Sequence, residues 1–154
     1  AASLVFMHSA LDSALHDLCR ATALAAPADW EQFIHDRKAR LADVRSQGCE
    51  ALVRQQIEDF VSGVGRESMP KKTDRLFQVC GQIRYVREGY RFDRSQLEAL
   101  DRQRHDVVHG LLKQQPIANI DGILKYLLDT GLFFFGAVNH RYGLKIDSGS
   151  ARRA

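Results

Sequence analysis

The chain has 154 residues, of which 45% are hydrophobic and 27% are charged. This balance is ordinary for a globular domain and excludes an intrinsically disordered chain. The length fits a single domain, which we place at residues 1–147, followed by a flexible polar tail at 148–154. The net charge of +3 is too small to indicate a partner by itself.

Cysteine usage and hydropathy bear on the compartment. Cys19, Cys49 and Cys80 are odd in number and widely spaced among apolar residues. Such thiols are typical of buried side chains in a reducing compartment, not of a disulfide framework or a zinc site. Residues 1–15 lack the basic region of a signal peptide. The most apolar run, 122–138, contains two charges and is shorter than the roughly 20 residues of a membrane span. We therefore expect a cytoplasmic protein that does not contact a membrane.

The first half of the chain carries apolar residues at helical spacing. This spacing predicts a long helix over residues 3–25 that ends before Pro27. Asp29 is expected to cap a second helical stretch over residues 29–62. Gly48 lies inside that stretch, so it forms either one kinked helix or two helices.

The middle of the chain contains the clearest predicted loop. Residues 63–72 hold two glycines and a proline and are expected to form a connection. A shorter helix is predicted around residues 76–83. Ser95 followed by Glu98 matches the capping-box pattern, which predicts the start of a helix that ends near Gly110.

The last predicted helix follows Pro116, with Asn119 as its cap and apolar residues from Ile120 to Val138. No segment of the chain alternates apolar and polar residues over several positions, which is the pattern typical of strands. The sequence therefore predicts an all-α fold, a bundle of four to six helices.

One charged residue interrupts an apolar arc of the helix predicted to end at Gly110. At about 100° per residue, Arg104 falls within an arc formed by Leu97, Leu100, Val107 and Val108. A guanidinium at such a position is costly unless it is paired or faces a partner. Arg104 therefore indicates an internal ion pair, a subunit interface or a catalytic cleft, or an arginine that reaches solvent along the apolar surface.

The segment Arg104-His105-Asp106-Val107-Val108-His109-Gly110 resembles the RNA-cleaving motif of the HEPN superfamily, the higher eukaryote and prokaryote nucleotide-binding domains. In many of these domains an Arg, four to six intervening residues and a His lie near the end of a late helix. A polar residue commonly follows the Arg, as His105 does here. Arg102 gives a second match, with six intervening residues. The resemblance implies a HEPN-like helical domain over nearly the whole chain.

The resemblance also implies an activity, the metal-independent cleavage of RNA by attack of a ribose 2′-hydroxyl on the neighbouring phosphate. His109 would be the general acid or base and Arg104 the phosphate clamp, because imidazole transfers protons near neutral pH and guanidinium stays charged. Asp106 or His105 would orient them. Arg104 and His109 diverge by about 140° on an ideal helix, whereas Arg102 and His109 differ by about 20°. Either Arg104 reaches around, the site forms across a dimer, or Arg102 is the clamp.

The histidines also have interpretations other than RNA cleavage. His105 and His109 are four residues apart, the spacing of two ligands of one metal, but no obvious third ligand follows, and we expect no metal or cofactor. His16 is expected at the surface or at a pocket edge, paired with Asp12. Three further histidines are expected to be solvated or capping residues: His8, His35 and His140.

The segment from Arg66 to Arg104 has ten Lys or Arg residues against six acidic ones, a net charge of +4. It is either a surface for RNA phosphates or an ordinary solvated helix face. The residues predicted to bind RNA are Lys71, Lys72, Arg75, Arg84 and Arg87. Three neighbouring aromatic residues could either stack on bases or form a packed connection: Tyr85, Tyr90 and Phe92.

The expected partners follow from the same resemblance. They are RNA, a second copy of the chain with the two 95–110 helices facing each other, and a nucleotidyltransferase-like antitoxin, since such domains occur in toxin–antitoxin and phage-defence systems. Two alternatives belong to other classes. One is a non-catalytic HEPN-like module that binds RNA, a nucleotide or a protein. The other is a structural interaction domain with Arg104 in an ion pair.

Overall fold

The computed structural model describes residues 2–34, 37–81, 87–110 and 117–143, and these residues form helices and connections without a strand. The elements in chain order are α1 (Ala2–Ala25), the 3-10 helix η1 (Pro27–Phe33), α2 (Leu41–Gln47), α3 (Cys49–Val64), α4 (Met69–Cys80), α5 (Arg94–Val108) and α6 (Ile120–Tyr142). The all-α class predicted from the helical spacing is therefore confirmed. The boundary at residue 147 and the tail at 148–154 lie outside the described residues.

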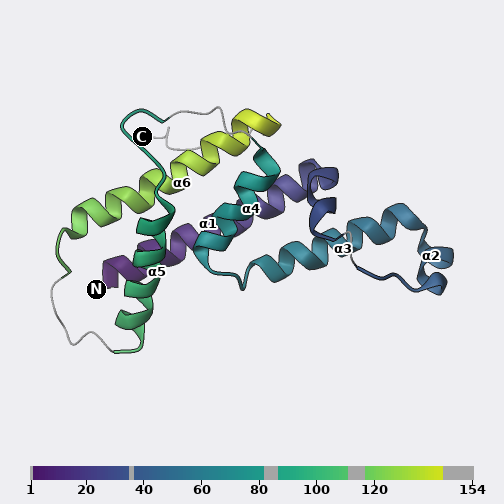
Figure 1. Cartoon of the computed structure of the whole chain (residues 1–154), viewed down its shortest axis with the longest axis horizontal. Helices are drawn as coiled ribbons and strands as arrows, with labels where there is room; N and C mark the ends of the chain where they lie inside the picture. The colour runs from purple at the N-terminus through teal and green to yellow at the C-terminus, as the bar shows by residue number, and fades with distance from the viewer. Residues whose placement is uncertain (1, 35–36, 82–86, 111–116, 144–154) are drawn as a thin grey trace, which may run out of the picture.

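Helix α1 is the central element of the fold. It packs against η1, α3, α4, α5 and α6, and it runs beside α6 in the same direction (Figure 1). Apolar residues recur every three or four positions along α1, so one stripe of the helix is buried. Its members are Leu4, Leu11, Leu15 and Leu18. The N-terminal part of α1 lies beside α5, whereas α2 lies at the opposite end of the molecule (Figure 1).

Aromatic side chains fix the segment that follows α1. Trp30 of η1 is fully buried, and its indole Nε1 donates a hydrogen bond to Thr22 Oγ1 at 3.2 Å. The ring of Phe33 stacks on Phe60 of α3 with 5.4 Å between centroids. The guanidinium of Arg75 lies over Phe33, 4.9 Å from the centroid, a cation–π contact. These contacts join η1 to α1, α3 and α4.

The predicted second helical stretch is divided more finely than the spacing indicates. Gly48 separates α2 from α3 with a φ of 84°, which a residue without Cβ adopts readily; this confirms that Gly48 interrupts the stretch. The expectation that Asp29 caps a helix is wrong. Ala26 is the N-cap residue of η1 and makes no side-chain cap. Asp29 instead accepts a hydrogen bond of 2.8 Å from the Tyr142 hydroxyl.

Two other predicted boundaries shift by a few residues. The loop expected at 63–72 is shorter, because α4 begins at Met69 and includes Pro70 in its first turn, where a missing N–H costs nothing. The cap of α5 is Asp93, whose carboxylate accepts from the backbone N–H groups of Ser95 and Gln96. The predicted Ser95 capping box is therefore wrong by two residues. An aspartate is an equally good N-cap.

The described residues contain no helix that is both long and apolar enough to span a membrane. Helix α6, which includes the whole apolar run, buries Asp129 and Thr130. Its N-cap is Asn119, as predicted, but Asn119 takes a left-handed conformation with φ 54° and makes no side-chain cap.

Candidate functional site

Arg104 lies where α5 packs on the bundle. Leu97 and Leu100 from the same side of the helix are buried in the core, and Arg104 is half-buried. Its Nε atom is buried and has no hydrogen-bond acceptor among the residues that the structure describes. The predicted apolar arc ends before Val108, which is 49% exposed. A buried N–H donor without an acceptor is uncommon and costly, so Arg104 is the anomalous residue of this helix.

Beside Arg104 lies a histidine of α1. His8 is only 4% exposed, and its Nε2 donates to Oδ1 of Asp101 on α5 at 2.9 Å. Burial lowers the pKa of His8; the Asp101 carboxylate opposes this shift, and the charge of Arg104 adds to it. The expectation that His8 is solvated or capping is wrong. Its position on the α1 stripe, four residues after Leu4 and three before Leu11, is the signal that could have revealed the burial.

A second polar contact joins α1 to α4. The Lys72 ammonium lies 2.7 Å from Oδ1 of Asp12, and the Lys72 side chain is 1% exposed. An ammonium is buried in a protein only when a partner such as this carboxylate compensates for lost hydration. The contact removes Lys72 from the predicted RNA-binding surface. No hydrogen bond or ion pair between Asp12 and His16 is observed, and His16 instead donates to the carbonyl of Val61.

Five side chains from three helices therefore form one group, which we call the polar cluster: His8, Asp12, Lys72, Asp101 and Arg104. Within it, each carboxylate already has a partner. Asp101 is bound by His8, and Asp12 is bound by Lys72. Arg104 forms no ion pair with a described residue, so the internal carboxylate proposed for it from the sequence is not observed. A free guanidinium beside a buried polar network is suited to bind an anion.

The other residues of the motif lie on a different side of α5. His105 and His109 are exposed, and their rings lie 4.2 Å apart between centroids. His109 continues the helical hydrogen bonding, with its N–H bonded to the carbonyl of His105. The divergence of about 140° between Arg104 and His109 therefore persists. Arg102 is exposed and lies on the side of His109. No three potential metal ligands gather within the described residues.

Among the described residues, four cations of the basic segment form ion pairs with carboxylates. The ion pairs of this segment are Lys72 with Asp12, Arg75 with Glu67, Arg87 with Asp129, and Arg94 with both Asp74 and Glu98. Of the residues predicted to bind RNA, Lys71 is exposed, and no ion pair links it to a described residue. Arg84 lies outside the described residues. These four cations are compensated by carboxylates and are not free to bind RNA phosphates, whereas no ion pair links the other described cations of the segment to a described residue.

The aromatic residues next to these cations are packed against α4 and α6. The Tyr90 hydroxyl donates to Thr130 Oγ1 at 2.8 Å, and burial raises the pKa of Tyr90 well above its usual range. Phe92 packs edge-on against Phe134, 5.4 Å between centroids. For these two residues the packed-connection interpretation is confirmed, whereas Tyr85 lies outside the described residues.

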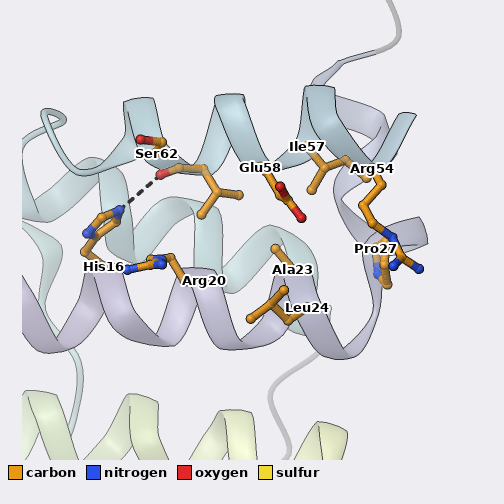
Figure 2. A pocket seen from close by; sticks show the side chains of 10 residues that line it. His16, Arg20, Ala23, Leu24, Pro27, Arg54, Ile57, Glu58 and Ser62 are labelled. Carbon is orange, nitrogen blue, oxygen red and sulfur yellow. Dashed lines mark hydrogen bonds between the residues drawn. The ribbon is translucent and has the colours of Figure 1, made fainter. Parts of the chain in front are cut away.

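A separate pocket of about 540 Å³ lies between α1 and α3 (Figure 2). His16 lies at its edge, as predicted, and donates from Nε2 to the carbonyl of Val61 at 3.1 Å. Figure 2 shows Arg20 directed toward His16, Arg54 at the other end beside Pro27, and Glu58 between them. Neither arginine forms an ion pair with a described residue. The sequence contained no motif that marked this pocket.

Of the other predicted site residues, Asp106 is half-buried on α5. His140 is exposed near the end of α6, as expected, and His35 lies outside the described residues. Comparison of the chain with family models, with curated proteins and with solved structures gives no match.

Proposed function

We propose that this protein is a metal-independent endoribonuclease of the HEPN type, acting as a toxin or phage-defence effector. The observation that supports it most is the state of Arg104: a half-buried guanidinium with a buried, unsatisfied Nε and no carboxylate partner among the described residues. A stability role would favour an ion pair or an apolar residue at this position. An anion-binding role favours a free guanidinium.

The chemistry assigned to the motif is a transesterification. The ribose 2′-oxygen attacks the adjacent phosphorus, the 5′-oxygen of the next nucleotide leaves, and a cyclic phosphate remains. Arg104 binds the phosphate and stabilises its developing charge. His109 transfers the proton between the 2′-hydroxyl and the leaving oxygen. His105, whose ring contacts that of His109, and Asp106 support its orientation.

A complete site needs two copies of the chain. Arg104 faces the bundle and His109 faces solvent, so we propose a homodimer in which two α5 helices bring Arg104 of one chain to His109 of the other. Leu97 and Leu100 are buried inside the protomer and are not available to this interface. The apolar contribution comes instead from the exposed Val108. A nucleotidyltransferase-like antitoxin remains a proposed partner, on the resemblance alone.

The test is incubation of purified protein with labelled RNA, with and without EDTA. We expect cleavage that survives EDTA, leaves cyclic-phosphate ends, and stops when the ribose at the cut carries no 2′-hydroxyl. Arg104→Ala and His109→Ala should each abolish it, whereas the matched controls Arg66→Ala and His140→Ala, which change exposed residues outside α5, should not. Loss of cleavage in EDTA with recovery in zinc would favour a His105–His109 metal site. Loss in Arg102→Ala but not in Arg104→Ala would make Arg102 the clamp.

A second candidate is the non-catalytic alternative, the binding of a phosphorylated small molecule such as a nucleotide. The pocket between α1 and α3 favours it, because Arg20 and Arg54, which form no ion pair with a described residue, line it together with the apolar Ala23 and Ile57 (Figure 2). Titration with adenosine monophosphate and with inorganic phosphate tests this function. Nucleotide binding should be lost in Arg20→Ala and Arg54→Ala but kept in Arg45→Ala. This result, together with no cleavage of labelled RNA by the wild type, would support nucleotide binding over the ribonuclease.

A further inference from the structure

Helix geometry places one carboxylate beside Arg104, yet the two do not pair. Asp101 precedes Arg104 by three residues on α5, and side chains three apart on a helix are neighbours. An Asp–Arg pair at this spacing is favourable on a helix, and a guanidinium can bind a carboxylate with two parallel hydrogen bonds. No ion pair between Asp101 and Arg104 is observed. The Asp101 carboxylate is instead directed at a residue of another helix.

The residue that holds Asp101 is His8. Its Nε2 donates to Asp101 Oδ1 at 2.9 Å, and its side chain is only 6% exposed, so packing in the α1 stripe prevents the ring from turning away. The other carboxylate near His8 is Asp12, which is bound to Lys72 at 2.7 Å. Each acid of the polar cluster thus has a partner on another helix, His8 of α1 for Asp101 and Lys72 of α4 for Asp12. Arg104 keeps its charge uncompensated as a result.

We propose that His8 is a positioning residue that withholds Asp101 from Arg104 and so keeps the guanidinium available to an RNA phosphate. The inference rests on the proposed function, since it assigns to that site a residue 96 positions earlier in the chain than Arg104. It accounts for a histidine at a core position that an apolar residue would fill with less desolvation. It also accounts for the Arg104 Nε atom that lacks an acceptor, because an ion pair of Arg104 with Asp101 would compete with the binding of an RNA phosphate.

The experiment measures affinity for a fluorescein-labelled single-stranded RNA with 2′-O-methyl riboses, which cannot be cut. In the full chain, His8→Leu removes the partner of Asp101, and we expect binding to weaken about tenfold, the scale of one charge-assisted contact, as in Arg104→Ala. His8→Gln can still donate to Asp101 and should bind like the wild type. Adding Asp101→Asn to His8→Leu should restore affinity, because an amide cannot neutralise Arg104.

Glu98→Gln in the His8→Leu background is the matched control. It removes one negative charge from α5 while Arg94 stays paired with Asp74, and it should not restore binding. Melting temperatures identify folded variants, and His8→Met replaces His8→Leu if the latter does not fold. Two results would overturn the inference provided that Arg104→Ala binds RNA weakly. One is wild-type affinity in a folded His8→Leu protein, and the other is a loss of affinity in His8→Leu that Asp101→Asn does not restore. Wild-type binding by Arg104→Ala would overturn the proposed function itself.

Discussion

Arg104 and His8 both occupy positions that an amphipathic pattern gives to apolar residues, on α5 and α1 respectively. Each is stabilised less well than a leucine would be at the same place. His8 exchanges hydration for one hydrogen bond to Asp101, and Arg104 leaves Nε without an acceptor. Residues of this kind, which break a local rule without a gain in stability, are expected at functional sites.

Replacement of Arg104 by methionine should therefore stabilise the fold while it abolishes RNA cleavage. Methionine fills a similar space and removes a buried unsatisfied donor, whose penalty is about 1–3 kcal/mol, so we expect the free energy of unfolding to rise by about 1 kcal/mol. Urea denaturation measures it. Arg102→Met, at an exposed position, is the control and should change stability by less than about 0.5 kcal/mol. A clear destabilisation by Arg104→Met would mean that the guanidinium has a native partner.

The buried His8 also predicts a pH dependence of stability. Its pKa is lowered from the ordinary value of 6.5, so the unfolded chain binds a proton at a pH where the folded chain does not. The stability contribution is complete above about pH 6.5 and is lost as the pH falls toward the lower folded-state pKa. Each unit by which the folded-state pKa lies below the unfolded-state pKa corresponds to about 1.4 kcal/mol of folding stability. Groups facing the ring are Asp101 and Arg104 from α5 and Asp12 from α1, with Lys72 of α4 bound to Asp12.

The measurement compares urea unfolding of the wild type and of His8→Gln at pH 7.5 and 5.5. The other histidines are present in both proteins, so their contributions cancel in the difference. We expect the wild type to lose more stability than His8→Gln between the two pH values. Parallel losses would show that His8 titrates normally in the folded state.

Among the helices, α1 determines how the others are arranged, because it contacts α3, α4, α5 and α6. Its apolar stripe packs in the core between these helices, and its polar residues select the orientation of α4 and α5. His8 binds α5 and Asp12 binds α4. Hydrogen bonds and ion pairs require defined geometry, so they select one rotation of α4 and α5 among those that leucine packing alone would tolerate.

The contact between α1 and α4 predicts an asymmetric response to mutation. Asp12→Ala leaves the Lys72 ammonium, 1% exposed, buried without a partner, and we expect a loss of about 3 kcal/mol or more. Lys72→Met leaves Asp12, whose side chain is 34% exposed and can be hydrated, so the loss should stay below about 1.5 kcal/mol. The free energy of unfolding of the double variant, measured by chemical denaturation, should equal that of Lys72→Met. Equal losses for the two single variants would show that Lys72 gains solvent when Asp12 is removed.

At the scale of the whole molecule, the two halves of the motif face different directions. Arg104 belongs to the polar cluster between helices, whereas His105 and His109 lie on the outer side of α5. Under the proposed function, one protomer would place the phosphate clamp and the proton carrier on different sides of α5, and a symmetric dimer is the proposed way of bringing them together.

Mixing two inactive variants tests this assembly. Arg104→Ala and His109→Ala proteins, exchanged to equilibrium, should recover about a quarter of wild-type cleavage, because half of the dimers are mixed and each mixed dimer has one intact site. Mixing Arg104→Ala with Arg104→Ala, His109→Ala double variant is the control and should recover nothing. A monomer that cleaves RNA would contradict the shared site and make Arg102 the partner of His109 within one chain.

The local part of this structure could be predicted from the sequence. Apolar spacing and the residue types at helix ends are local properties, and they correctly predicted the all-α class, the extent of α1, the interruption at Gly48 and the start of α6 directly after Asn119. The same spacing identified Arg104 as a charge on an apolar arc. Caps were less well predicted, because Asp93 and Ser95 are both suitable N-caps and propensity does not decide between them.

The partners of these residues were decided only by the tertiary structure. His8 and Asp101 are 93 residues apart, Lys72 and Asp12 are 60 apart, and no spacing rule links positions on different helices. Whether Lys72 faces RNA or the core depends on the rotation of α4 about its axis, which packing against α1 sets. The burial of His8 likewise needs α5 to cover it. Periodicity specifies which face of a helix is apolar, but only the assembled bundle specifies which polar side chains meet there.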